Sequence, residues 1–269
     1  MPRPGVPCKL AHVPWFDPVP EIRAEVAVLA ITLVTFFLSM PLFARTARND
    51  AGVARTHGDR SSFLIGSFLV GWFYWMIGPL VRFSVRIGLG PFFFNLTGLA
   101  LGISAGVLFA LGHAGAAGWA VLLGGIADIF DGHLARTTGV ASAKGAFIDS
   151  SLDRFSEVAA LVGLSVLVGP SANGQLLVAT ALGGSLLVSY TRARGESLGV
   201  DCRGGVMQRP QRVLLLGFGA ILDPTLSALS GEARGAVLIP VLALVAVGAL
   251  GTAVYRTVWI ARELRVAAN

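Results

Sequence analysis

Charged residues are scarce in this sequence. Only 13% of its 269 residues are Asp, Glu, Lys or Arg, whereas 54% are hydrophobic, and the mean hydropathy is +0.73. Soluble globular domains carry roughly 25% charged residues. The shortage of charge excludes a water-soluble domain of ordinary composition and predicts a protein that crosses a membrane several times.

Cysteine is also scarce. Cys8 and Cys202 lie far apart, and neither has a second ligand at metal-binding spacing, which excludes a disulfide framework and a structural zinc site. The N-terminal stretch contains six prolines in place of the basic-then-apolar order of a cleavable signal peptide, so we expect the first apolar run to stay in the mature protein. The net charge of +6 comes from clusters between apolar runs, which does not fit the continuous basic face of a nucleic-acid binder.

Long apolar runs divide the chain into candidate membrane spans, each of which needs about 20 mostly apolar residues. Seven runs approach that length: 26–44, 92–113, 118–135, 147–168, 176–190, 213–229 and 236–255. The segment 61–88 combines tryptophans and a tyrosine with two arginines, which is typical of a helix at the membrane interface. The sequence predicts an all-α, polytopic bundle. Its domain, residues 61–269, would contain six core spans and the interfacial helix, after an N-terminal extension, residues 1–60, with one extra span.

The positions of the basic residues predict an orientation, because Lys and Arg favour the cytoplasmic ends of membrane spans. They gather next to one set of span ends, and in the connections after residue 88 only Arg234 falls on the opposite side. We therefore expect an integral protein of the cell inner membrane whose basic face, and any site beside it, faces the cytoplasm.

Four aspartates lie close to this basic face. Asp128 and Asp131 are three residues apart and Asp149 and Asp153 are four apart, so each pair shares one face of its helix. Ionised carboxylates inside a membrane are costly unless cations or water compensate them. Their oxygens suit Mg²⁺ or Mn²⁺, and we expect two ions that handle phosphate. The simpler interpretation is that the acids pair with neighbouring basic residues, namely Arg136, Lys144 and Arg154.

The full pattern resembles the complete signature of the CDP-alcohol phosphatidyltransferase family: Asp128-x2-Asp131-Gly132-x2-Ala135-Arg136-x8-Gly145-x3-Asp149-x3-Asp153. The resemblance covers roughly residues 67–265. It implies a six-helix membrane enzyme, usually a homodimer, that transfers a phosphatidyl group from CDP-diacylglycerol to an alcohol and releases CMP. It also implies that the four aspartates hold the metal and that Asp153 is the catalytic base.

The resemblance extends to the donor site. The family usually has Pro, then Asp or Asn, and a Thr three positions further on, whereas this chain has Pro91-Phe-Phe-Phe-Asn95, so Asn95 is expected to supply a hydrogen bond. The residues expected to bind the CDP-lipid are Gly132, Ala135, Arg136, Gly145 and Asn95.

A loop expected from residue 189 to residue 212 concentrates five arginines, which favours an acceptor that carries its own phosphate. Its Ser-Tyr-x-Arg-Ala-Arg and Arg-Pro-x-Arg segments are similar to phosphatidylinositol phosphate synthases, whose acceptor is inositol phosphate. This resemblance assigns acceptor-phosphate binding to Ser189, Arg192, Pro210, Arg212 and Arg256. An alternative interpretation places these arginines at anionic lipid headgroups.

Two further alternatives concern the activity. Glycerol 3-phosphate or another alcohol can replace inositol phosphate as the acceptor. A divalent-cation or proton pathway would also place acids in a membrane, but it needs polar groups through the whole membrane depth. The outer halves of the expected spans are instead rich in Leu, Val, Gly and Ala.

Overall fold

The computed structural model describes residues 22–49, 67–230 and 235–267, and within these ranges every regular element is an α-helix. Cys8 and most of the connection before the interfacial segment lie outside the described residues. The helices are α1 (Ile22–Asn49), α2 (Ser67–Arg86), α3 (Pro91–Ala110), α4 (Ala114–Thr137), α5 (Ala143–Val168), α6 (Ala172–Ser197), α7 (Arg209–Ser230) and α8 (Leu238–Ala267). The all-helical prediction is confirmed.

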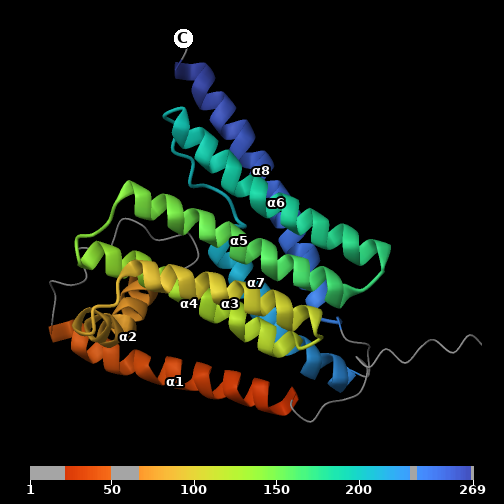
Figure 1. Ribbon diagram of the computed structural model, residues 1–269, viewed down its shortest axis with the longest axis horizontal. Coiled ribbons are helices and arrows are strands. Elements are labelled where there is room, and N and C mark those ends of the chain that lie inside the picture. Colours follow the sequence, from red (N-terminus) through yellow and green to blue (C-terminus); the bar gives the residue numbers. More distant parts are fainter. Residues whose placement is uncertain (1–21, 50–66, 231–234, 268–269) are drawn as a thin grey trace, which may run out of the picture.

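Helices α3, α4, α5 and α7 form the centre of the bundle, in which α3 packs against both α4 and α5, and α4 packs against α7. Helices α6 and α8 pack mainly against each other, and Figure 1 shows this pair extending beyond the ends of the others. α5 and α7 join the pair to the centre. The buried core consists mostly of Ala, Leu, Val and Phe side chains from α3 to α8.

Glycines let α3 and α5 approach backbone to backbone. A methyl group added at Gly163 would overlap the carbonyl oxygen of Gly106, and one at Gly106 would overlap that of Ala159. No larger residue fits at either position without separating the helices. This contact fixes α5, which carries two of the four aspartates, against α3.

Six of the described helices are long and apolar enough to cross a membrane, namely α1, α3, α4, α6, α7 and α8. The protein is therefore an integral membrane protein. The predicted span 147–168 lies in α5, which is long enough to cross a membrane but is not one of the six apolar helices. The reason is that α5 carries Asp149, Asp153, Arg154 and Glu157.

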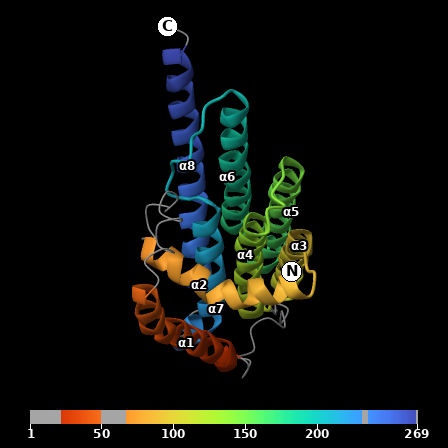
Figure 2. The same ribbon diagram turned by 90° about the vertical axis from the view of Figure 1, so that its left-hand side faces the viewer.

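Segment 61–88 forms α2 from residue 67 onward, and Figure 2 shows α2 lying across the bundle. It also contacts α1. Trp72 is only 1% exposed, and its indole nitrogen donates to the hydroxyl of Ser39, 2.9 Å away, while its ring packs on Phe36 with centroids 4.0 Å apart. The extra N-terminal span is thus docked on the interfacial helix.

Candidate metal and nucleotide site

The four aspartates meet where α4 ends and α5 begins. Gly139, with φ +71°, turns the chain after α4, and the hydroxyl of Ser142 caps α5 by accepting from the backbone nitrogen of Gly145, 3.1 Å away. This short turn reverses the direction of the chain, so α4 and α5 lie close where the turn joins them, while both helices pack mainly against α3. It therefore brings the carboxylates of the last turns of α4 and the first turns of α5 together, as the sequence pattern predicts.

Three of these acids form a compact group of oxygen ligands. Among the described residues, Asp128, Asp131 and Asp149 each offer a carboxylate oxygen within 4.8 Å of the other two. Asp131 is 2% exposed, and its Oδ1 is buried without a hydrogen-bond partner in the described part of the chain. Buried, closely spaced carboxylates with an unused oxygen fit a hard divalent cation such as Mg²⁺ or Mn²⁺. Ligation by Asp153 stays a prediction.

Arg209, at the first position of α7, connects the two acid pairs. Its guanidinium lies 2.5 Å from the carboxylate of Asp128 and 2.6 Å from that of Asp153. The sequence pattern did not identify Arg209 as a site residue. It lies far along the chain from both acids, and only the packing of α7 on α4 brings it to them.

Asn95 makes a second connection, from α3. With its amide nitrogen turned toward the acids, it donates to Oδ2 of Asp131 at 2.5 Å and to Oδ1 of Asp149 at 2.7 Å. The predicted hydrogen-bonding role of Asn95 toward the donor stays a prediction, because in this arrangement its partners are the acids themselves.

A pocket of about 340 Å³ opens beside Asp131 and Asp149. Its lining includes all the residues predicted to bind the CDP-lipid, which are Asn95, Gly132, Ala135, Arg136 and Gly145. Phe92 and Val140 add an apolar side to it. At Gly132 a methyl group would lie only 3.2 Å from Nη1 of Arg136, so the small residue leaves room for that guanidinium. The pocket therefore combines polar, cationic and apolar surface next to the metal ligands.

The predicted acceptor residues are distributed over three helices. Ser189 and Arg192 lie within α6, which continues to Ser197, so the expected loop from residue 189 is wrong: residues 189–194 contain no Pro or Gly, and the helix continues through Gly195. Arg192 is exposed and pairs with Glu196 at 2.9 Å. Pro210 is exposed in the first turn of α7.

The other two arginines are buried. Arg212, 1% exposed, forms two hydrogen bonds with the carboxylate of Glu157, through Nε at 2.7 Å and Nη2 at 3.0 Å. Arg256, 2% exposed, donates to the carbonyls of Gly204 at 2.8 Å and Val188 at 2.9 Å. The sequence pattern missed Glu157, although it follows Asp153 by four residues and so continues the acidic face of α5.

Three of the predicted acceptor residues are arginines that lie near one another. Arg256 interacts electrostatically with both Arg192 and Arg212, which are of like charge. Arg192 and Arg212 have carboxylate partners in Glu196 and Glu157, while the buried Arg256 is held by backbone carbonyls and would gain from an anion beside it. The arrangement therefore fits a phosphate group beside Arg256.

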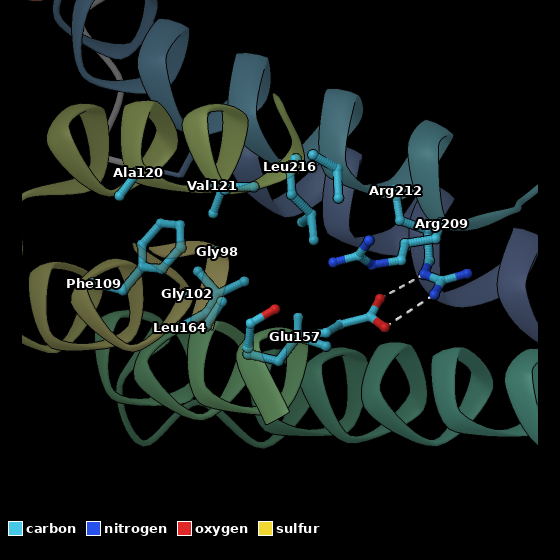
Figure 3. A pocket seen from close by; sticks show the side chains of 16 residues that line it. Gly98, Gly102, Phe109, Ala120, Val121, Glu157, Leu164, Arg209, Arg212 and Leu216 are labelled. Atoms are coloured by element: carbon cyan, nitrogen blue, oxygen red, sulfur yellow. Dashed lines mark hydrogen bonds and ion pairs between the residues drawn. The ribbon is translucent and has the colours of Figure 1, made fainter. Parts of the chain in front are cut away.

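Beyond Glu157 and Arg212 the centre of the bundle is apolar. Figure 3 shows the cavity that continues between α3, α4, α5 and α7, and its walls include Phe109, Leu164 and Leu216. A pathway for ions or protons would need polar groups at this depth. The lining thus favours a site open to one side over a passage through the membrane.

The fold and this site together define a polytopic membrane protein with a divalent-cation site beside a nucleotide-sized pocket. A family model described as CDP-alcohol phosphatidyltransferase matches residues 89–216. A phosphatidylinositol phosphate synthase from Streptomyces avermitilis is 30% identical over 211 residues, which are 74% of this chain and 84% of the relative. The chain belongs to the CDP-alcohol phosphatidyltransferase family and is an enzyme of that type.

Further relatives are consistent with this assignment. An archaetidylinositol phosphate synthase from Methanothermobacter thermautotrophicus is 33% identical over 136 residues, 51% of this chain and 68% of the relative. The crystal structure of Mycobacterium tuberculosis phosphatidylinositol phosphate synthase with CDP-DAG bound matches with a TM-score of 0.60 and 27% identity, covering 68% of this chain and 92% of that chain. A structure of the same enzyme in complex with manganese and citrate has the same TM-score and identity and covers 68% of this chain and 87% of that chain.

Proposed function

We propose that this chain transfers the phosphatidyl group of CDP-diacylglycerol to inositol phosphate and releases CMP. The observation that carries the choice of acceptor is the group of three arginines, Arg192, Arg212 and Arg256, whose charges lie near one another. Arg212 pairs with Glu157 and Arg192 with Glu196, whereas Arg256 donates to two backbone carbonyls, so a phosphate on the acceptor would supply Arg256 with an anionic partner. The names of the relatives from Streptomyces and Mycobacterium, which are phosphatidylinositol phosphate synthases, support the same acceptor.

The acidic group supports a metal-assisted transfer, because Asp128, Asp131 and Asp149 offer closely spaced oxygens. When bound there, divalent cations neutralise the pyrophosphate of the donor and the charge that develops on departing CMP. In the pocket beside them, Arg136 is placed to bind a donor phosphate oxygen, and Gly132 and Gly145 let the nucleotide approach the backbone.

Asp153 is the proposed general base. Its carboxylate accepts the proton of the acceptor hydroxyl, and the hydroxyl oxygen forms a bond to the phosphorus that carries the diacylglycerol. The bond from that phosphorus to the bridging oxygen breaks, and the electron pair leaves with CMP. Ser189, Pro210 and the three arginines hold the acceptor phosphate, so that its hydroxyl is directed at the donor.

The acceptor is tested by incubating the purified protein in nanodiscs with CDP-diacylglycerol, Mg²⁺ or Mn²⁺, and one alcohol at a time. Inositol phosphate is expected to give the fastest CMP release, and glycerol 3-phosphate and free inositol much slower release. Faster release with glycerol 3-phosphate would overturn the acceptor but not the class of reaction. Absence of CMP release with every alcohol would overturn both.

We also propose that residues 61–269 form the catalytic domain. The protein spans the inner membrane in this proposal, with the acids on its cytoplasmic side. The basic residues near the acids support this orientation through the positive-inside tendency. A cysteine placed at exposed Lys144, in a chain lacking Cys8 and Cys202, is expected to react with an impermeant maleimide in inside-out vesicles and not in intact cells. Labelling of intact cells would reverse the orientation. A homodimer stays a prediction of the family resemblance, and native mass spectrometry tests it.

A further inference from the structure

The four aspartates are matched by two internal donors, and each donor joins one acid of α4 to one acid of α5. Arg209 lies between Asp128 and Asp153, at 2.5 Å and 2.6 Å. Asn95 lies between Asp131 and Asp149, at 2.5 Å and 2.7 Å. Each of the four acids therefore has a hydrogen-bond or ion-pair partner from α7 or α3.

Only one of the two donors carries charge, and it contacts an acid of the metal group. Oδ2 of Asp128 lies against Nη1 of Arg209, while the same residue belongs to the set of three oxygen ligands. Because a divalent cation at Asp128 and the guanidinium repel each other and need the same carboxylate, the ion pair of Asp128 with Arg209 opposes metal binding. Its second carboxylate, Asp153, is the proposed base.

We propose that Arg209 is an internal counter-ion that competes with the divalent cation for Asp128. In the metal-free protein it holds the two acids together; when the cation binds, the guanidinium gives up Asp128 and leaves Asp153 free to accept a proton. This inference rests on the proposed metal-assisted function.

The surroundings of Arg209 provide a second position for its charge. Glu157 is close enough to interact electrostatically with Arg209, and both residues line the cavity of Figure 3. A guanidinium released from Asp128 thus keeps an acidic neighbour on the side of the site where Arg212 lies. A guanidinium released from Asp128 would therefore share the Glu157 carboxylate with Arg212.

The test measures metal affinity without substrate. Purified protein is titrated with Mn²⁺ and free Mn²⁺ is followed by electron paramagnetic resonance. Arg209→Gln is expected to bind Mn²⁺ about 10- to 100-fold more tightly than the wild type, the range that corresponds to a charge-assisted hydrogen bond. Arg209→Lys keeps the charge but cannot hold both acids in a planar fork. Its Mn²⁺ affinity is expected to lie between those of the wild type and Arg209→Gln. Arg203→Gln is the matched control, because Arg203 pairs with Asp201 on an exposed loop and should leave the affinity unchanged.

A thermal measurement keeps the inference testable if Arg209→Gln is less stable. Removing an internal counter-ion lowers the melting temperature of the metal-free protein more than that of the Mn²⁺-saturated protein, so the rise caused by Mn²⁺ should be larger in the variant than in the wild type. A purely structural residue would lower both temperatures equally. That result, or a Mn²⁺ affinity that is unchanged or weaker in Arg209→Gln, would overturn the role of Arg209 alone. A wild-type protein that binds no Mn²⁺ would overturn the proposed metal-assisted function with it.

Discussion

Replacing Glu157 with alanine is expected to destabilise the folded protein by about 3–5 kcal/mol, the usual cost of removing one partner of a buried ion pair. The Arg212 side chain is 1% exposed and that of Glu157 is 12% exposed, so water cannot replace the lost carboxylate. Among the described residues, the guanidinium would keep a neutral partner, the carbonyl oxygen of Met207 at 3.2 Å. Most of the cost comes from the uncompensated positive charge.

Two further variants separate stability from acceptor binding. Glu157→Gln keeps an acceptor oxygen, and we expect its free energy of unfolding to fall by less, roughly 1–3 kcal/mol. The double variant Glu157→Leu with Arg212→Met removes both charges and fills the volume with apolar atoms, so it should regain most of the stability. It should nevertheless have little activity with inositol phosphate, because the proposed phosphate ligand is gone.

The assay is thermal unfolding in detergent, followed by size-exclusion chromatography, together with CMP release for each variant. Glu157→Ala should unfold at a clearly lower temperature than the wild type. The double variant should unfold close to the wild-type temperature. The reasoning would be refuted if Glu157→Ala unfolded at the wild-type temperature. It would also be refuted if the double variant were less stable than Glu157→Ala. The ion pair would then stabilise the folded protein by more than the burial of its two charges destabilises it.

Three other outcomes follow from the structure. Asp153→Asn should abolish CMP release while CDP still binds by calorimetry, and full turnover would remove Asp153 from the role of base. Gly163→Ala should destabilise the protein by about 1–3 kcal/mol in thermal unfolding, because its methyl group meets the Gly106 carbonyl, whereas Gly183→Ala, with nothing within 4 Å, should be neutral or slightly stabilising. Equal effects of these two would contradict the close contact. Asp223→Ala should lower the free energy of unfolding by about 1–3 kcal/mol, because the Asp223 carboxylate accepts from the backbone nitrogens at the start of α8. Wild-type stability of this variant would show that these donors find other partners.

Local patterns predicted much of this molecule. Hydropathy located every core helix, although their ends shifted by several residues, because capping residues such as Ser142 lie outside the apolar runs. The spacing of Asp128, Asp131 and Asp149 predicted their grouping, since two helices joined by a short turn leave few other arrangements. The pocket residues Gly132, Ala135, Arg136 and Gly145 follow from the same two helices and the turn between them, whereas Asn95 comes from α3.

Long-range contacts could not be predicted in the same way. The partners of Arg209 and Arg212 depend on how α7 packs, which no spacing along the chain encodes. The aromatic segment around Trp72 indicated an interfacial helix, but Trp72 itself is buried against α1, because the N-terminal helix covers a ring that would otherwise face lipid. Periodicity reports that a face is apolar and does not report which neighbour covers it.

The separate packing of α6 and α8 has a consequence for how such enzymes diversify. Ser189, Arg192 and Arg256 belong to this pair, whereas the acids belong to α4 and α5, which close contacts with α3 hold in place. A displacement of the pair would alter the room for the alcohol and leave the distances among the carboxylates intact. Exchanging these two helices between relatives that use different alcohols should therefore change which alcohol is accepted, while the release of CMP from the donor stays the same.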